Sequence, residues 1–212
     1  FLKACLFLSA GSVIHAAHHE QDIRMLGGIY KKMPLTFLAY LAGALALAGF
    51  PYTSGFFSKD QIIWSVFSNP SLLQDKATLL YPYSFISNNV TLISKCTWAV
   101  AVLSAFLTAF YMFRLYFVVF VTPNHHKKEY VYTSKTITFP LVVLAVGAVT
   151  AGFLNLPSIF GGTHMVDTWL GSLNSKTITL SHSTEYILMA LSVLVASFGI
   201  FIAYKKYARF DL

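Results

Sequence analysis

The chain has 212 residues, of which 56% are hydrophobic and only 11% are charged, and its mean hydropathy is +0.64. A soluble domain carries about 25% charged residues, so this composition indicates an integral membrane protein. The net charge of +7 does not point to a nucleic-acid partner, because the basic residues lie in the gaps between apolar runs, where membrane topology requires them.

Five largely apolar runs predict five membrane passes, since about 20 apolar residues span the hydrocarbon core. The runs are too long for the strands of a membrane barrel and do not alternate between polar and apolar residues. We therefore predict an all-α integral membrane protein of about five transmembrane helices, one of them discontinuous. The predicted passes cover about residues 1–17, 34–67, 97–122, 137–156 and 186–204.

The second run is too long for one straight pass. Residues 34–67 would extend about 50 Å as a single helix, against about 30 Å of hydrocarbon. The middle of the run reads Gly49-Phe50-Pro51-Tyr52-Thr53-Ser54-Gly55. Pro51 removes a backbone donor, and Gly55 permits conformations that other residues resist. We predict two half-helices with a break near 51–55, an arrangement that recurs at ion and substrate sites of transporters.

The basic residues between the passes are distributed unequally. The segments that follow passes one, three and five carry nine Lys and Arg residues, whereas the other two connections carry three. This bias predicts that loops 18–33 and 123–136 and the C-terminus lie on the cytoplasmic side, which in a mitochondrion is the matrix side. The nine are Arg24, Lys31, Lys32, Lys127, Lys128, Lys135, Lys205, Lys206 and Arg209.

Lys59 and Asp60 follow the predicted break, near the start of the second half-helix. A charged residue at membrane depth costs about 3 kcal/mol even on lenient insertion scales, and such residues mark ion and proton pathways. We predict that the two form a proton-relay or gating pair. The alternative is an interfacial pair at a helix start, in which the helix N-terminus stabilises the carboxylate of Asp60.

Three further residues are candidates for the same pathway or its support. Lys3 lies about 20 Å from the end of its pass, near mid-membrane, unless the register of that pass places it at the far surface. His15 is able to titrate near neutral pH and to give protons access, with a capped interfacial histidine as the alternative. Arg114 lies among aromatic residues, which predicts a structural anchor held by cation–π contacts.

No motif predicts a metal or a bound cofactor in this chain. The stretch His18–Asp22 holds two histidines and two carboxylates, but adjacent histidines on a helix point about 100° apart, so we interpret it as a solvated loop. Cys5 and Cys96 lack the spacing of a metal site and are interpreted as packed side chains. The Gly-rich nucleotide motifs GxxxxGK[ST] and GxGxxG do not occur.

Two stretches are similar to a known family. FLKACLFLSAGSVIHAAHHEQDIRMLGGIYKKMP (residues 1–34) and ALAGFPYTSGFFSKDQII (residues 46–63) resemble the antiporter-like membrane subunits of respiratory complex I of the NADH:ubiquinone oxidoreductase chain 5 (NuoL) type. The segment YMFRLYFVVF, which contains Arg114, fits the next helix of that family. The resemblance is specific over about residues 1–67 and weaker beyond about residue 122.

The resemblance implies a larger fold of two inverted five-helix bundles, each with a broken helix. Residues 1–122 would form the end of the second bundle, and residues 123–212 would add C-terminal transmembrane helices. Lys3 would be the central-axis lysine of the family. Lys59 would be the lysine of the broken helix at the outlet half-channel, with Asp60 beside it and His15 as a polar neighbour.

The resemblance also implies a function: a proton-translocating membrane-arm subunit, or a fragment of one, that couples NADH:ubiquinone electron transfer to proton pumping through Lys3 and Lys59/Asp60. NADH, FMN, iron–sulfur clusters and ubiquinone would bind to partner subunits of that enzyme and none to this chain. Expected partners are the other membrane-arm subunits, a separate N-terminal part of the same subunit, and lipids. The expected location is the mitochondrial inner membrane or, alternatively, a bacterial plasma membrane. The alternative function is that of an Mrp-type Na⁺/H⁺ antiporter subunit.

Overall fold

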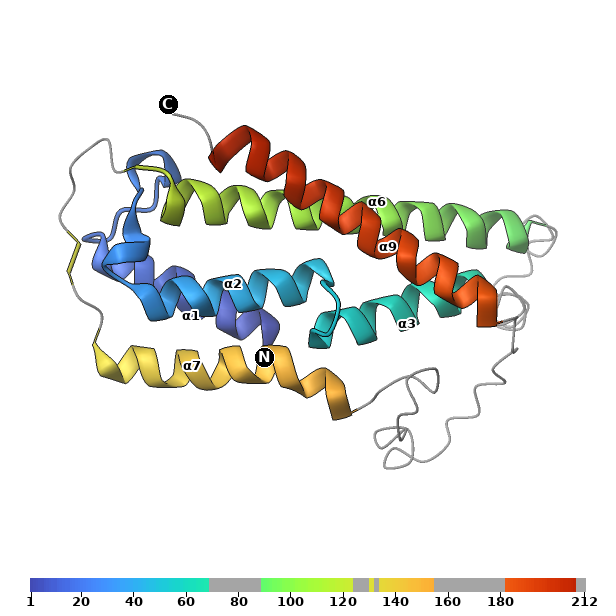
Figure 1. Ribbon diagram of the computed structural model, residues 1–212, viewed down its shortest axis with the longest axis horizontal. Coiled ribbons are helices and arrows are strands. Elements are labelled where there is room, and N and C mark those ends of the chain that lie inside the picture. The colour runs from blue at the N-terminus through green and yellow to red at the C-terminus, as the bar shows by residue number, and fades with distance from the viewer. Residues whose placement is uncertain (69–88, 124–129, 132–133, 155–181, 209–212) are drawn as a thin grey trace.

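The described part of the chain consists of helices and their connections. The computed structural model describes residues 1–68, 89–123, 130–131, 134–154 and 182–208, and no strand occurs within these ranges (Figure 1). The predicted all-α membrane fold is confirmed. The helices are α1 (Leu2–Ala16), α2 (Pro34–Ala48), α3 (Ser54–Ser68), α6 (Val90–Tyr116), α7 (Lys135–Thr150) and α9 (His182–Ala203).

Within the described ranges, three helical stretches are long and apolar enough to cross a membrane: Thr91–Val121, Lys135–Leu154 and Tyr186–Ala208. Helices α1 and α2 are apolar but have only 15 residues each. Five residues separate the end of α2 from the start of α3, so one predicted pass is indeed discontinuous. Helix α6 begins before the predicted residue 97, because Lys95 lies exposed on its surface and a charge there does not end a helix.

Helices α1 and α2 pack closely because small residues line their interface. Cys5, Ser9 and Ser12 are buried on one face of α1. The Cys5 thiol donates to the Ala39 carbonyl of α2 at 3.3 Å, and the Ser9 hydroxyl donates to the Cys5 carbonyl at 2.7 Å. Small side chains let membrane helices approach, and these bonds satisfy their polar atoms. Leu141 of α7 packs against Cys5 and Ala39 from the other side.

Aromatic rings fill the space between α2 and the end of α6. The Phe37 ring stacks on that of Tyr116 with centroids 5.2 Å apart, and the Tyr40 ring lies 5.4 Å from that of Phe120. Tyr116 and Phe120 are 7% and 1% exposed, so these rings are core rather than lipid-facing surface. Aromatic pairs of this geometry stabilise by about 1 kcal/mol beyond their burial, which anchors α2 to α6.

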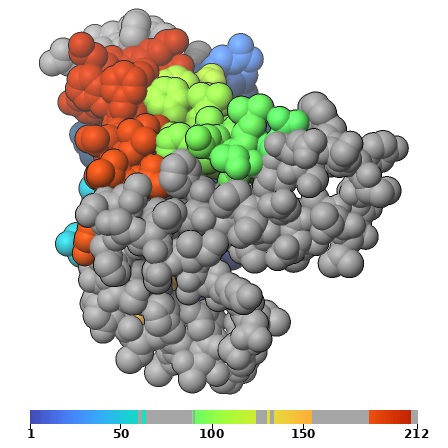
Figure 2. All heavy atoms as spheres, turned by 90° about the vertical axis from the view of Figure 1, so that its right-hand side faces the viewer, coloured from blue at the N-terminus to red at the C-terminus, as the bar shows by residue number. Residues whose placement is uncertain are grey.

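Helix α9 crosses α6 at a glycine. A Cβ added to Gly199 would lie 2.9 Å from the backbone oxygen of Phe106, so the two helices approach there as only glycine allows. The Phe106 ring also stacks on that of Phe198, with centroids 6.1 Å apart. Seen along the bundle, α9 (red and orange) lies beside α6 (green) at one edge of the molecule (Figure 2).

The segments predicted to share one side of the membrane meet at one end of the bundle. The loop after α1, the end of α6, the start of α7 and the end of α9 all lie at the left in Figure 1. The Tyr130 hydroxyl accepts from the Gly27 N–H at 3.0 Å and donates to the Gly27 carbonyl at 2.9 Å, and the Val131 N–H donates to the Ala16 carbonyl at 3.0 Å. We call this the basic end. The compartment that it faces stays a prediction.

Replacing Gly27 by alanine is expected to destabilise the protein by about 1–3 kcal/mol, the cost of overpacking a filled site. The added Cβ would lie 2.8 Å from the Pro123 carbonyl oxygen and 2.9 Å from that of Thr122, which are backbone atoms and cannot rotate aside. The measurement is the thermal unfolding midpoint of the purified protein in detergent. Gly11→Ala is the control, because nothing lies within 4 Å of a Cβ there. Equal midpoints for both variants would contradict the close approach of the two loops.

Candidate functional site

Helix α2 ends in a left-handed turn. Gly49 has φ of +80°, a conformation in which glycine carries no steric penalty. Its N–H donates to the Ala46 carbonyl at 3.2 Å, and the Phe50 N–H donates to the Leu45 carbonyl at 3.0 Å. These two bonds form a glycine C-cap of the Schellman type and satisfy two of the last four carbonyls of α2. The helix therefore ends before Pro51 is reached.

The break extends from Gly49 to Thr53, earlier than the predicted residues 51–55. The Thr53 hydroxyl donates to the Phe50 carbonyl at 2.6 Å and closes the turn. Gly55 belongs to the first turn of α3, where its conformation is ordinary and only its size matters. A Cβ on Gly55 would overlap the carbonyl oxygen of Ala46. Gly55 is thus required for the close approach of the two half-helices and not for the turn itself.

Lys59 reaches back across the break. It lies four residues after Gly55, on the face of α3 that meets the end of α2. Its ammonium group donates to the Ala48 carbonyl at 2.9 Å, and its half-buried side chain lies over Gly49, whose added Cβ would be 3.3 Å from Nζ. The carbonyl end of a helix carries partial negative charge, so this hydrogen bond is charge-assisted. The hydrogen bond joins the start of α3 to the end of α2.

One contact partner of Lys59, the Ala48 carbonyl, is a backbone group, which sequence reasoning missed. A carbonyl has no residue type to single it out. Gly49 after an apolar run was the available signal, since glycine commonly follows the last residue of a helix. Asp60 follows Lys59 in α3, but its side chain lies outside the described part of the chain. The predicted pairing of these two charges therefore stays a prediction.

Helix α7 fixes the start of α3. The Ser54 hydroxyl donates to the Ala148 carbonyl of α7 at 2.5 Å. The Phe57 ring packs against that of Phe153, just beyond α7, with centroids 5.7 Å apart. Gly152 allows this approach, because a Cβ there would lie 2.5 Å from the Ser54 Cα. The position of Lys59 thus depends on a helix that is distant in the chain.

Lys3 lies at the exposed start of α1 and lines a groove of about 440 Å³ between α1, α2 and α6. One end of the groove is lined by Gln21 and Ile23, in the loop at the basic end. Leu47, in the last turn of α2, lines it near the helix break. The remaining lining is mostly apolar and includes Leu6, Phe7, Tyr40, Tyr111, Met112 and Leu115.

The start of α1 lies at the level of the helix break. A Cδ of Leu2, the neighbour of Lys3, is 3.6 Å from the position of a Cβ on Gly55. Leu47, which shares the groove with Lys3, directly precedes the Ala48 carbonyl that accepts from Lys59. The structure therefore brings the segment of Lys3 and the segment of Lys59 to one region of the bundle.

His15 and Arg114 lie toward the basic end instead. His15 is exposed, and its ring lies 6.0 Å from that of His19. The Arg114 guanidinium lies 5.6 Å from the centroid of the Tyr207 ring. This cation–π contact joins α6 to the extension of α9. From the sequence, the expected partners were the aromatic residues next to Arg114 in its own helix.

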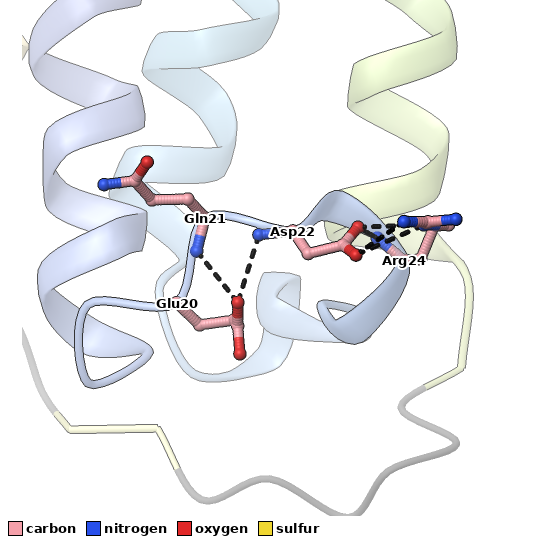
Figure 3. Close-up of polar contacts among 4 residues, drawn as sticks. All are labelled: Glu20, Gln21, Asp22 and Arg24. Carbon is pink, nitrogen blue, oxygen red and sulfur yellow. Dashed lines mark hydrogen bonds and ion pairs between the residues drawn. The ribbon is translucent and has the colours of Figure 1, made fainter.

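The carboxylates after α1 organise their own loop (Figure 3). Glu20 accepts from the N–H groups of Gln21 and Asp22, each at 3.1 Å. Asp22 accepts from the Arg24 N–H at 3.0 Å and pairs with its guanidinium at 2.9 Å. The hydrogen bonds of the guanidinium to the Asp22 carboxylate, and then the negative charge of that carboxylate, raise the pKa of Arg24. No group of three metal-ligating side chains occurs in the part of the chain that the structure describes.

Comparison with known proteins connects these features to one family. Residues 1–75, which contain both lysines and the break, match the family model described as "NADH:quinone oxidoreductase/Mrp antiporter, TM". NADH-ubiquinone oxidoreductase chain 5 of Chondrus crispus is 35% identical over 96% of this chain and 29% of its own length. The corresponding protein of Acanthamoeba castellanii is 39% identical over 81% of this chain and 22% of its own length.

A bacterial relative shows the same similarity. NADH-quinone oxidoreductase subunit L of Rhodobacter capsulatus is 38% identical over 76% of this chain and 22% of its own length. The chain thus spans less than a third of the length of these relatives. Its first 75 residues match the NADH:quinone oxidoreductase/Mrp antiporter family of membrane proteins, and most of the chain is similar to chain 5 and subunit L of NADH oxidoreductases.

Proposed function

We propose that this chain forms part of a proton path in the membrane arm of an NADH:ubiquinone oxidoreductase, with Lys59 as a group that takes up and releases protons. The observation that carries the proposal is the hydrogen bond from the Lys59 ammonium to the Ala48 carbonyl across a helix break. A titratable group that bridges two half-helices links its proton occupancy to their relative position. The names of the relatives support the oxidoreductase as the host enzyme.

The mechanism follows from what the lysine does in each protonation state. The ammonium form compensates the negative end of α2 and holds α3 against it. The neutral amine lacks that charge and binds the carbonyl more weakly. Loss of the proton therefore loosens the break, and movement of α3 in turn changes the stability of the charged form. Such a two-state element converts a proton transfer into a structural change.

The path would run from the groove of Lys3 to Lys59 and Asp60 and leave at the end opposite the basic end. His15 would lie at the entry, and Arg114 would anchor α6 without carrying protons. We expect NADH, FMN, iron–sulfur clusters and ubiquinone in partner subunits, so this chain would belong to an enzyme without performing its redox chemistry. The remaining length of the relatives supports a further part of the same subunit as partner.

The membrane would be the mitochondrial inner membrane or a bacterial plasma membrane, since relatives come from both kinds of organism. The basic end would face the matrix or the cytoplasm. Mrp-type Na⁺/H⁺ antiport is the second candidate function, because the matching family model covers both classes of protein.

Lys59→Arg is expected to stop proton transfer through this chain while preserving the fold. Arginine keeps the charge and the donor for Ala48 but does not release its proton near neutral pH. We expect the rate of proton transfer through this path to fall at least about 100-fold, the scale of a lost acid–base group. The ratio of protons taken up to NADH oxidised should then lose the share that this path carries. The measurement is proton uptake per NADH oxidised, followed with a pH-sensitive dye in reconstituted vesicles.

Lys59→Ala removes both the charge and the hydrogen bond, so it should lose proton uptake and stability together. Lys95→Ala, an exposed lysine on α6, is the control and should leave the proton-to-electron ratio unchanged. A normal ratio in Lys59→Arg together with a low melting temperature in Lys59→Ala would assign Lys59 a structural role only.

Gly49→Ala is expected to lower the same ratio without removing any titratable group. Alanine at φ of +80° is strained by about 1 kcal/mol, and its Cβ would lie 3.2 Å from Cδ and 3.3 Å from Nζ of Lys59. The side chain is then displaced from the Ala48 carbonyl. Gly11→Ala serves as the control in the same assay. An unaltered ratio in Gly49→Ala would show that the contact across the break is not needed for proton transfer.

Replacing Na⁺ by K⁺ in the assay separates the two candidate functions. A redox-driven proton path should keep its rate, because no step in it uses Na⁺. An antiporter should lose proton movement when Na⁺ is absent and regain it when Na⁺ is restored. A requirement for Na⁺ that persists in the absence of NADH would favour the antiporter.

A further inference from the structure

Two cations from different helices converge on one aromatic ring at the basic end. The Arg114 guanidinium lies 5.6 Å from the centroid of the Tyr207 ring, and Nζ of Lys206 lies 5.7 Å from the same centroid. Both side chains are exposed. Among the described residues, neither Arg114 nor Lys206 forms an ion pair with a carboxylate. Like charges held close together favour binding of an anion.

The fold holds these cations in place through two distorted helix ends. Helix α6 continues into a π-helical turn, η3 (Phe117–Val121), and α9 into another, η6 (Tyr204–Ala208). The Thr122 hydroxyl, directly after η3, donates to the Tyr207 carbonyl at 3.3 Å, and the Phe117 ring lies 5.6 Å from that of Tyr204. Single π-helical turns are rare and occur often at functional sites. Here they bring Tyr207 next to α6.

An exposed apolar stripe on α9 leads up to the cations. Leu194, Phe198 and Phe201 are 67%, 58% and 53% exposed, and their spacing places them on one face of the helix. Lys205 continues that face, and its Nζ lies 5.7 Å from the centroid of the Phe201 ring. This face therefore has a cation at the end of the predicted membrane span Tyr186–Ala208 and hydrocarbon below it.

Helix α6 has a similar order. Leu103 and Leu107 are 58% and 52% exposed, Tyr111 follows on the same face, and Arg114 ends the series at the basic end. Cations at the membrane surface with apolar side chains below them match the two parts of a lipid, a charged headgroup and its acyl chains. A soluble anion would use the cations alone and would leave the apolar face uncovered.

We propose that Arg114, Lys205 and Lys206 bind the phosphate of one anionic phospholipid, with an acyl chain along Leu194, Phe198 and Phe201. The occupant is a lipid because the charged and the apolar surfaces are continuous on α9. It is anionic because Arg114 and Lys206 lie on one ring, Lys205 directly precedes Lys206 on the exposed helix end, and no described carboxylate pairs with them. The site lies at the opposite end of α6 from its start near Val90 and is separate from the helix break.

The test is photo-crosslinking from p-benzoylphenylalanine in place of Phe201, in the assembled complex in nanodiscs of equal parts phosphatidylglycerol and phosphatidylcholine. Mass spectrometry of the peptide that contains position 201 identifies the attached lipid. Each cation near a membrane surface favours an anionic lipid by about fivefold. We therefore expect phosphatidylglycerol adducts to exceed phosphatidylcholine adducts by at least about 25-fold. In Arg114→Gln/Lys206→Gln the excess should fall to about fivefold or less.

Two controls make the result specific. Lys31→Gln removes an exposed cation that lies over Tyr30 at the same end, a ring that no other cation of the described residues contacts, and should leave the excess unchanged. The probe in place of Phe139, 74% exposed on α7 with one lysine a turn away, should show an excess of about fivefold at most. Where the double variant fails to assemble, Lys206→Gln alone should lower the excess about fivefold.

Several outcomes would overturn the proposal. Equal adducts of the two lipids would reduce the site to an apolar face, and an adduct to a protein would mean that a partner helix covers it. An excess that the double variant retains would remove the role of the cations. Inorganic phosphate at about 10 mM, a usual buffer concentration, should not displace the lipid. Displacement of the lipid by phosphate would make this a site for a soluble anion.

Discussion

The hydrogen bond from the Lys59 ammonium to the Ala48 carbonyl is the interaction on which the rest of the site depends. It crosses a helix break, so it joins two segments that do not share a backbone hydrogen-bond ladder. The break leaves carbonyls at the end of α2 without partners inside the helix, and each of them needs a donor from outside it. The lysine satisfies one of these carbonyls and at the same time finds a negative surrounding for its own charge.

Glycine makes this contact possible at two positions, for different reasons. Gly49 accepts the left-handed conformation that ends α2, and it leaves room for the lysine side chain above it. Gly55 lets the first turn of α3 touch the last turn of α2. The hydrogen bond of Ser54 to α7 then fixes the direction in which α3 leaves. The close approach of the two half-helices therefore creates the space in which the Lys59 side chain forms its hydrogen bond across the break.

Charge is arranged in two zones of the bundle. Lys3 and Lys59 belong to the region around the break, where Lys3 lies exposed at the start of α1 and Lys59 lies half-buried against the end of α2. The other cations of the described chain gather mainly at the basic end, where tyrosine rings contact Lys31, Arg114 and Lys206. Cations at the membrane surface determine the orientation of a membrane protein and contact lipid headgroups, whereas a cation within the hydrocarbon core has a high insertion free energy.

The sequence by itself determined the helical class, the membrane location, the presence of a break and the identity of its lysine, because hydropathy, proline, glycine and charge act locally. Tertiary structure decided what those residues contact. Three features could not be predicted from the sequence, since each depends on two segments meeting in space. They are the contact of Lys59 with the Ala48 carbonyl, the contact of Arg114 with the Tyr207 ring, and the position of Gly55 in the first turn of α3. Every residue has a backbone carbonyl, so the sequence does not single out the one that binds a side chain. The distance between two helices is fixed only when the whole bundle has packed.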